Sequence, residues 1–359
     1  MTISYLIYIS AVVLSVFFAF LAQKFKKSDK PQPIFIFMSM LPLIFIMGFR
    51  DVSIGVDGYS YLNGYINANS TNIFQYYGSN ITEPGFYVLY KISYFLGDFQ
   101  WLFILTATIT ICFFYKAMSY EINNISFALV IFIFATTQYF YYFGILRMGI
   151  AVSIIAFAYR YIIENDKKKF IIFVGIATMF HYSALFSFIL LFLSKNNQNV
   201  FKRNNILKIV LMIPVSFFVI KYLVFPFITA DRYQGYIASS GIIGTSFVSS
   251  LPLLLVFLIF FNKSIKNNRN YRFYFFLFVI KVITEIFAPI IGIGRMVWYV
   301  NLSIVFLFPS LIKMCKEREL KFLVFILIVS YCLLYSYSAY FGESFRGSYM
   351  LPYKIFFGE

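Results

Sequence analysis

The residues of this chain best suited to chemistry are one histidine, a few acids and four arginines that stand apart from the lysine-rich loops. His181 is the single histidine, and it lies in an uncharged apolar stretch, residues 170–194, between two lysine-rich segments. A titratable group inside lipid costs about 2.5–3.5 kcal/mol on insertion scales, so it usually has a partner or a function. His181 is a candidate catalytic base. The alternatives are a structural hydrogen bond beside Ser183 and phosphate binding as an imidazolium.

Two carboxylates compete with His181 for the role of base. Asp57 follows Arg50 and Gly55 in a compact charged corner after the second apolar run, although the arginine and acid could simply end a helix. Glu83 precedes Pro84 at the start of a short apolar segment, where helix capping alone would explain much of the pattern. A carboxylate in a loop has more freedom than His181 to approach a substrate.

The arginines outside the basic loops suggest an anionic ligand. A guanidinium can hold a phosphate with its bidentate fork, or it can anchor a helix end by snorkelling. Such residues, set beside several acids, are typical of a site for an anionic lipid or a nucleotide; they are Arg50, Arg147, Arg232 and Arg295. Tyr61 belongs to a tyrosine-rich loop that could face a glycan, or could form part of an interfacial aromatic belt. Lys281 and Glu285 share a helix face and predict an intramembrane ion pair.

Composition identifies the scaffold that must hold these residues. Of 359 residues, 61% are hydrophobic and 12% are charged, and the mean hydropathy is +0.80. A soluble domain cannot bury that much apolar surface, so the chain is predicted to be an all-α polytopic membrane protein with about 10–12 hydrophobic helices. The net charge of +16 comes from lysines in short loops between apolar runs, which is a topogenic pattern and argues against a nucleic-acid partner. The predicted spans are 3–22, 33–49, 99–118, 125–143, 146–163, 205–224, 246–262, 272–290, 296–313 and 321–341.

Two apolar pieces are expected not to span. Residues 83–97 are short and hold Lys91, which predicts an outer interfacial helix, and residues 170–194 have basic flanks on both sides, which predicts a re-entrant hairpin around His181. This topology puts most Lys and Arg residues in the cytoplasm and the candidate site residues at the outer face. The chain is then one membrane domain, 1–359, with extracytoplasmic loops at 50–83 and 225–245.

The order and spacing of these motifs resemble the EpsG family of Wzy-like polymerases, which act on bacterial exopolysaccharide, capsule and O-antigen. The resemblance covers roughly residues 50–309. The matching motifs are Arg50-(x)4-Gly55-x-Asp57-(x)3-Tyr61, Glu83-Pro84-Gly85-Phe86, Arg147-(x)3-Ala151, Phe180-His181-Tyr182-Ser183-Ala184 and Arg295.

The resemblance implies transfer of a growing glycan from an undecaprenyl diphosphate carrier to a lipid-linked repeat unit, on the outer leaflet of the bacterial cytoplasmic membrane. Neither a metal nor another cofactor is implied. The partners would be the lipid-linked donor and acceptor, membrane lipid and other polysaccharide-assembly proteins. Arginines would stabilise the leaving diphosphate, and His181, Asp57 or Glu83 would receive the proton. A flippase for the lipid-linked oligosaccharide and a glycan ligase remain alternatives.

Overall fold

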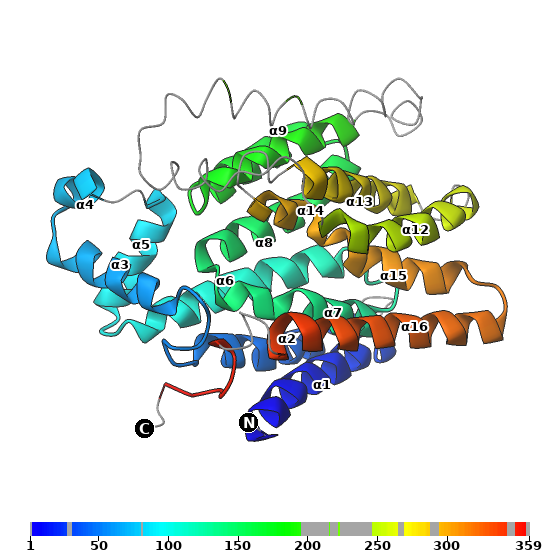
Figure 1. Ribbon diagram of the computed structural model, residues 1–359, viewed down its shortest axis with the longest axis horizontal. Helices are drawn as coiled ribbons and strands as arrows, with labels where there is room; N and C mark the ends of the chain where they lie inside the picture. The colour runs from blue at the N-terminus through cyan, green and yellow to red at the C-terminus, as the bar shows by residue number, and fades with distance from the viewer. Residues whose placement is uncertain are drawn as a thin grey trace. The chain divides into compact units, whose positions relative to one another are not determined.

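The computed structural model describes residues 2–26, 31–79, 82–194, 215, 222, 246–264, 269–287, 294–342 and 349–356. These residues are helical nearly throughout and contain no strand, only an isolated β-bridge between Arg50 and Ile355 (Figure 1). Five described helical segments are long and apolar enough to cross a membrane, which confirms the predicted all-α polytopic class. They are Thr2–Lys24, Gln100–Ser119, Leu146–Ile163, Gly294–Met314 and Arg318–Phe341.

The chain forms two compact units, and the first contains Met1–Phe157, Gly175–Tyr182 and Glu317–Glu359. Predicted spans in this unit coincide with helices, except that 125–143 breaks at Gln138 into an α-helix and a 3₁₀ helix. The elements of the unit are α1 (Thr2–Lys24), α2 (Pro33–Gly48), α3 (Gly58–Ser70), α4 (Ile73–Ser79), α5 (Pro84–Phe95), α6 (Gln100–Ser119), α7 (Phe127–Thr137), η1 (Tyr139–Phe143), most of α8 (Leu146–Ile163), α16 (Arg318–Ser336) and η8 (Tyr337–Phe341).

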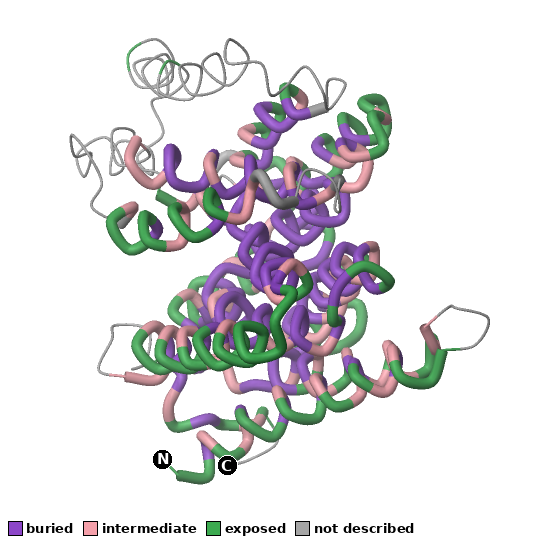
Figure 2. The backbone as a smooth tube through the Cα atoms, turned by 90° about the vertical axis from the view of Figure 1, so that its right-hand side faces the viewer, coloured by how far each residue is buried: buried purple, intermediate pink, exposed green. Residues whose placement is uncertain are grey.

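Helix α1 packs along α2, and α2 packs on α6. The buried residues of α1 are mostly small and recur at helical spacing, which lets the two backbones approach closely. Ser39 of α2 donates a hydrogen bond to the carbonyl of Ser15, at 2.6 Å, inside this contact. The opposite face of α1 exposes large apolar side chains such as Leu6 and Phe17, as expected for a lipid-facing surface. Figure 2 shows such helices, buried on one face and exposed on the other.

The predicted outer loop 50–83 contains helices α3 and α4, and it leads directly into α5. Helix α5 has 12 residues, too short to span, which confirms a short helix within 83–97. Lys91 donates a hydrogen bond to the carbonyl of Ala68 near the end of α3, so its charge is accommodated between α5 and α3. α3 packs on α5, and α5 packs on α6.

The second unit contains Ala158–Val174 and Ser183–Lys316. Helix α13 lies at its centre and packs on α12, α14 and α15. Tyr159 and Ser183 both contact Tyr299 of α14, through its carbonyl and its hydroxyl respectively. The elements of this unit are the end of α8, most of α9 (Lys167–Thr178), η2 (Tyr182–Ser194), η5 (Ser246–Ser250), α12 (Leu251–Ser264), α13 (Arg269–Phe287), η7 (Gly294–Val297), α14 (Trp298–Asn301) and α15 (Ser303–Met314).

The apolar stretch around His181 is broken where the hairpin was predicted to turn. Helix α9 ends at Thr178, and the 3₁₀ helix η2 begins at Tyr182. Each piece has fewer than 18 residues, so neither is long enough to span alone. Re-entry from the cytoplasmic side remains a prediction. Of the predicted span 205–224 only two residues are described, and the predicted loop 225–245 lies outside the described residues.

Candidate functional site

The centre of the candidate site is an ion pair between Glu83 and Arg147. Glu83 is the residue immediately before α5, and Arg147 lies in the first turn of α8. The Arg147 Nη1 atom donates to Glu83 Oε2 at 2.8 Å, and the side chains are 19% and 3% exposed respectively. Glu83 makes no side-chain capping bond to its own helix, so its carboxylate serves the arginine instead. The pair is nearly buried, and the guanidinium is its more accessible member.

Tyrosines from α3, α4 and α5 surround this pair. Tyr61 is 6% exposed, and its hydroxyl lies within hydrogen-bonding reach of Arg147. Burial raises the pKa of the Tyr61 phenol, and the charge of Arg147 opposes that rise. Tyr76 is 1% exposed and donates to Thr82 Oγ1 at 2.8 Å. Tyr90 of α5 is buried as well. The charge of Arg147 lowers the pKa of its phenol, and the charge of Glu83 raises it. The Tyr61 hydroxyl thus reaches the pair directly, and Tyr76 and Tyr90 are its electrostatic neighbours.

The turn that carries His181 is bonded to the start of α5. The backbone N–H of Gly85 donates to the carbonyl of Met179 at 2.8 Å. A Cβ atom at Gly85 would lie only 2.8 Å from that carbonyl oxygen, so this approach requires glycine. His181 is partly buried, two residues after the bonded carbonyl. The Glu83-Pro84-Gly85 and Met179-to-His181 segments, far apart in sequence, thus lie side by side.

Asp57 lies at the start of α3, four residues before Tyr61. Its carboxylate is partly buried and raises the pKa of Tyr61 electrostatically, which places it near the same hydroxyl. Among the sequence-predicted residues, the first unit thus brings together Asp57, Tyr61, Glu83 and Arg147, with the His181 turn bonded alongside.

Arg50 is fully buried, unlike Arg147. Its guanidinium donates to the carbonyls of Met47 and Phe143, at 3.0 and 2.6 Å, and lies over the rings of Phe103 and Phe143. Burial lowers the pKa of Arg50 to about 10, against the opposing effect of nearby tyrosines. The side chain is 0% exposed, so it joins the end of α2 to the residues before α8 and presents no surface to a ligand.

Residues 353–356 pack on the turn at residues 49–51, which we call the Arg50 corner. The backbone N–H of Asp51 donates to the carbonyl of Lys354, and the backbone N–H of Phe356 donates to the carbonyl of Phe49, each at 3.0 Å. Nearby, Tyr353 donates to the carbonyl of Ile46 at 3.0 Å. The corner is therefore completed by residues some 300 positions later in the chain, a contact that the local sequence does not indicate.

Two of the predicted arginines are not part of the first unit as the structure describes it. Arg295 lies in η7 of the second unit, partly exposed, and no hydrogen bond or ion pair joins it to another residue that the structure describes. Arg232 lies outside the described residues. Neither is placed relative to the Glu83–Arg147 pair.

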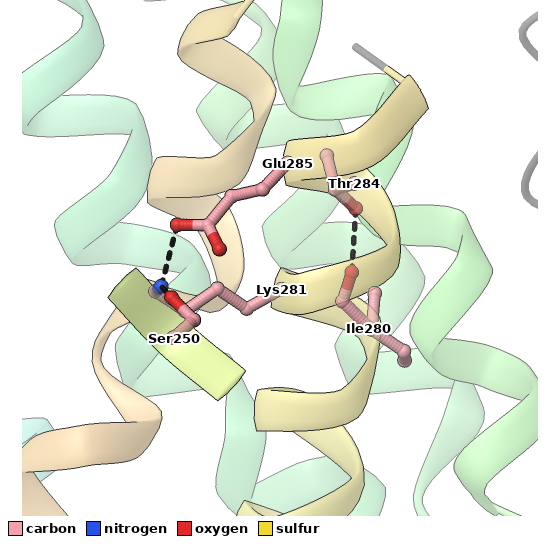
Figure 3. Close-up of polar contacts among 5 residues, drawn as sticks. All are labelled: Ser250, Ile280, Lys281, Thr284 and Glu285. Atoms are coloured by element: carbon pink, nitrogen blue, oxygen red, sulfur yellow. Dashed lines mark hydrogen bonds and ion pairs between the residues drawn. The ribbon is translucent and has the colours of Figure 1, made fainter. Parts of the chain in front are cut away.

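The predicted ion pair within α13 is present. Lys281 Nζ donates to Glu285 Oε1 at 2.6 Å and to Ser250 Oγ at 2.7 Å (Figure 3). Both charged side chains are about nine-tenths buried, with exposures of 7% and 11%. This contact confirms the shared helix face and ties α13 to η5, so the pair acts as an internal brace of the second unit.

Sequence reasoning did not single out Tyr90 or Tyr87 as part of the site. A signal was available, because Tyr87 and Tyr90 lie four and seven residues after Glu83, and their spacing puts both on one face of α5. The face could be predicted, but its partner Arg147 comes from another helix.

A family model described as the EpsG family matches residues 33–355, which include every described residue of the candidate site. No curated protein sequence and no solved structure matches the chain.

Proposed function

The chain belongs to the EpsG family of Wzy-like polysaccharide polymerases, and we propose that it joins undecaprenyl-diphosphate-linked repeat units at the outer face of the bacterial cytoplasmic membrane. The family supports a polysaccharide polymerase in a multi-pass membrane protein. The observation that carries the finer proposal is the Glu83–Arg147 pair, enclosed by tyrosines and bonded to the His181 turn.

The reaction needs one cation and one base close together. The acceptor's sugar hydroxyl attacks the anomeric carbon of the donor, a new glycosidic C–O bond forms, and the bond to the lipid diphosphate breaks. The leaving group departs as undecaprenyl diphosphate, and the hydroxyl proton passes to the base. Arg147 can stabilise the negative charge on the departing diphosphate through charge-assisted hydrogen bonds. Arginine side chains can supply this positive charge without a metal.

Glu83 is the base we assign, and Arg147 controls when it acts. In the substrate-free site the carboxylate is held by its 2.8 Å ion pair with Arg147, so it is not free to contact the acceptor hydroxyl. A bound diphosphate competes for the same N–H donors and releases the carboxylate toward the acceptor hydroxyl. We assign His181 the orientation of that hydroxyl, and Asp57 the alternative base. Tyr61 holds Arg147, and Arg50 acts as a positioning residue.

Deletion of the gene in its host tests the proposed function, with the lipid-linked glycans then analysed by mass spectrometry. A polymerase deletion leaves single repeat units that are accessible on the outer leaflet. A flippase deletion traps single units on the inner leaflet, and a ligase deletion leaves long chains on the carrier. Inward-facing single units or carrier-bound long chains would overturn the proposal.

A further inference from the structure

A cluster of aromatic rings adjoins the ion pair on the side of α4 and is not used by the chemistry above. The ring centroids of Tyr76 and Tyr87 are 4.9 Å apart, and those of Tyr77 and Tyr87 are 5.4 Å apart. Tyr76 and Tyr87 are buried, at 1% and 8% exposure, while Tyr77 is 39% exposed. Tyr182, from the His181 turn, is also 39% exposed. The accessible ring of Tyr77 thus packs on two buried rings, and the accessible Tyr182 is its electrostatic neighbour.

The two accessible tyrosines lie beside the carboxylate of Glu83. Burial raises the pKa of Tyr77, and the neighbouring hydroxyl of Tyr182 and the charge of Glu83 act in the same direction. Glu83 acts electrostatically on Tyr182 as well. A tyrosine of an interfacial belt turns its ring toward lipid and its hydroxyl toward the headgroups. Rings whose hydroxyls lie near a buried carboxylate line a polar site instead.

The cluster is held firmly in place. The bond from Gly85 to the Met179 carbonyl fixes the His181 turn, and therefore Tyr182, against the start of α5. The bond from Tyr76 to Thr82 fixes α4 to the residue before Glu83. A surface made of rigid aromatic rings loses little conformational entropy when a ligand binds.

We propose that Tyr77 and Tyr182 form a stacking subsite for one pyranose ring of the repeat unit, next to Glu83. The apolar C–H face of a pyranose packs on aromatic rings, while its hydroxyls reach the phenols and the adjacent carboxylate. The subsite would hold the acceptor sugar with its reactive hydroxyl near the base. This inference rests on the proposed polymerase function, since that function names the sugar as the ligand.

The test measures binding of a sugar that has neither lipid nor diphosphate. The probe is the repeat-unit oligosaccharide released from the host polymer by mild acid, titrated against the full chain in nanodiscs by saturation-transfer NMR. Tyr77→Ala and Tyr182→Ala should each weaken binding about tenfold, because each removes one stacking ring. Tyr77→Phe and Tyr182→Phe keep the rings and should stay within about threefold of wild type. They also show that a substitution at these sites does not unfold the chain.

Two control variants separate this inference from the proposed function. Tyr94→Ala removes a more exposed ring of α5, 59% exposed and about 16 Å along the helix from Glu83, and should bind the oligosaccharide normally. Arg147→Lys should bind it normally too, since the probe carries no diphosphate, and yet should make little polymer. Undiminished binding by both alanine variants, or no binding by wild type, would overturn the subsite. The gene deletion above decides the polymerase function independently.

Discussion

Arg147 occupies a position where a helix disfavours positive charge. The N-terminal end of a helix dipole is positive, so an arginine in the first turn of α8 loses up to about 1 kcal/mol there. Glu83 offsets this cost by direct contact. A cation kept at an unfavourable position, with part of its guanidinium accessible, is better explained by an anionic ligand than by helix stability.

Replacement of that arginine by lysine should therefore impair polymerisation while keeping the charge. A point charge cannot reproduce the bidentate fork, so Arg147→Lys should cost about 2–4 kcal/mol of barrier, or about 30- to 1,000-fold in rate. Polymer is measured at matched expression in the deletion host. Arg160→Lys, near the other end of α8, is the matched control and should polymerise normally. Full polymer from Arg147→Lys would remove Arg147 from the mechanism.

The base can be identified by comparing glutamine variants. Glu83→Gln keeps the size of the side chain but cannot take a proton, so turnover should fall at least about 100-fold, while lipid-linked substrate still binds. His181→Gln keeps a hydrogen bond and should retain most of the activity, whereas His181→Ala should not. Single-turnover assays in nanodiscs measure both effects. The opposite pattern, with His181→Gln inactive and Glu83→Gln active, would transfer the role of base to His181.

At the scale of elements, two segments pass so close to one another that only glycine fits. Gly55 has a φ of +99°, and a Cβ there would lie 2.5 Å from the Phe143 carbonyl oxygen. That contact sets the distance between the Arg50 corner and the residues that lead into α8. The fixed distance in turn places Asp57 and Tyr61 beside Arg147.

Gly55→Ala should destabilise the protein by more than backbone strain alone. The left-handed conformation costs an alanine about 1–2 kcal/mol, and the steric clash adds to it. Gly97→Ala is the matched control, because Gly97 has the same φ of +99° but no atom within 4 Å of the added Cβ. Thermal unfolding in detergent should show a clearly larger loss for Gly55→Ala. Equal losses of thermal stability in the two variants would mean that the close approach to Phe143 does not contribute to the cost of Gly55→Ala.

The helices were more predictable than their contacts. Hydropathy predicted the positions of α1, α2, α6 and α8, because a lipid environment requires long apolar runs there. It did not predict α3 and α4, whose mixed polar and aromatic composition is typical of a loop. The cover over Arg50 was missed for another reason. Its hydrogen bonds join residues that are far apart in the sequence, such as Phe49 and Phe356, and no local sequence pattern predicts such a pairing.

At the scale of the whole molecule, the excess of basic residues predicts which loops face the cytoplasm. The charge of +16 is concentrated in short lysine-rich segments, one of which forms the first turn of α9. A hairpin that turns near residues 179–181, and enters and leaves on that side, remains a prediction. Candidate residues of the second unit, Arg295 among them, remain predictions that the same Arg→Lys assay tests.

Cysteine labelling in intact cells checks the topology. After the native cysteines are replaced, a cysteine at Lys168 should resist an impermeant reagent added outside, because the start of α9 is predicted to be cytoplasmic. A cysteine at Phe74, 86% exposed on α4, should react readily as the positive control. Labelling of both positions from outside would show that residues 170–194 cross the membrane as an ordinary span.

The C-terminal residues that pack on the Arg50 corner limit how early in synthesis that corner can be completed. The hydroxyl of Tyr8 donates to the carbonyl of Met350, 342 positions later in the chain. Translation at about 5–20 residues per second separates these two residues by roughly 17–70 seconds. During that interval the first helices are already in the membrane, but the residues that seal the corner do not yet exist. A nascent chain therefore cannot complete the Arg50 corner until these last residues have been synthesised.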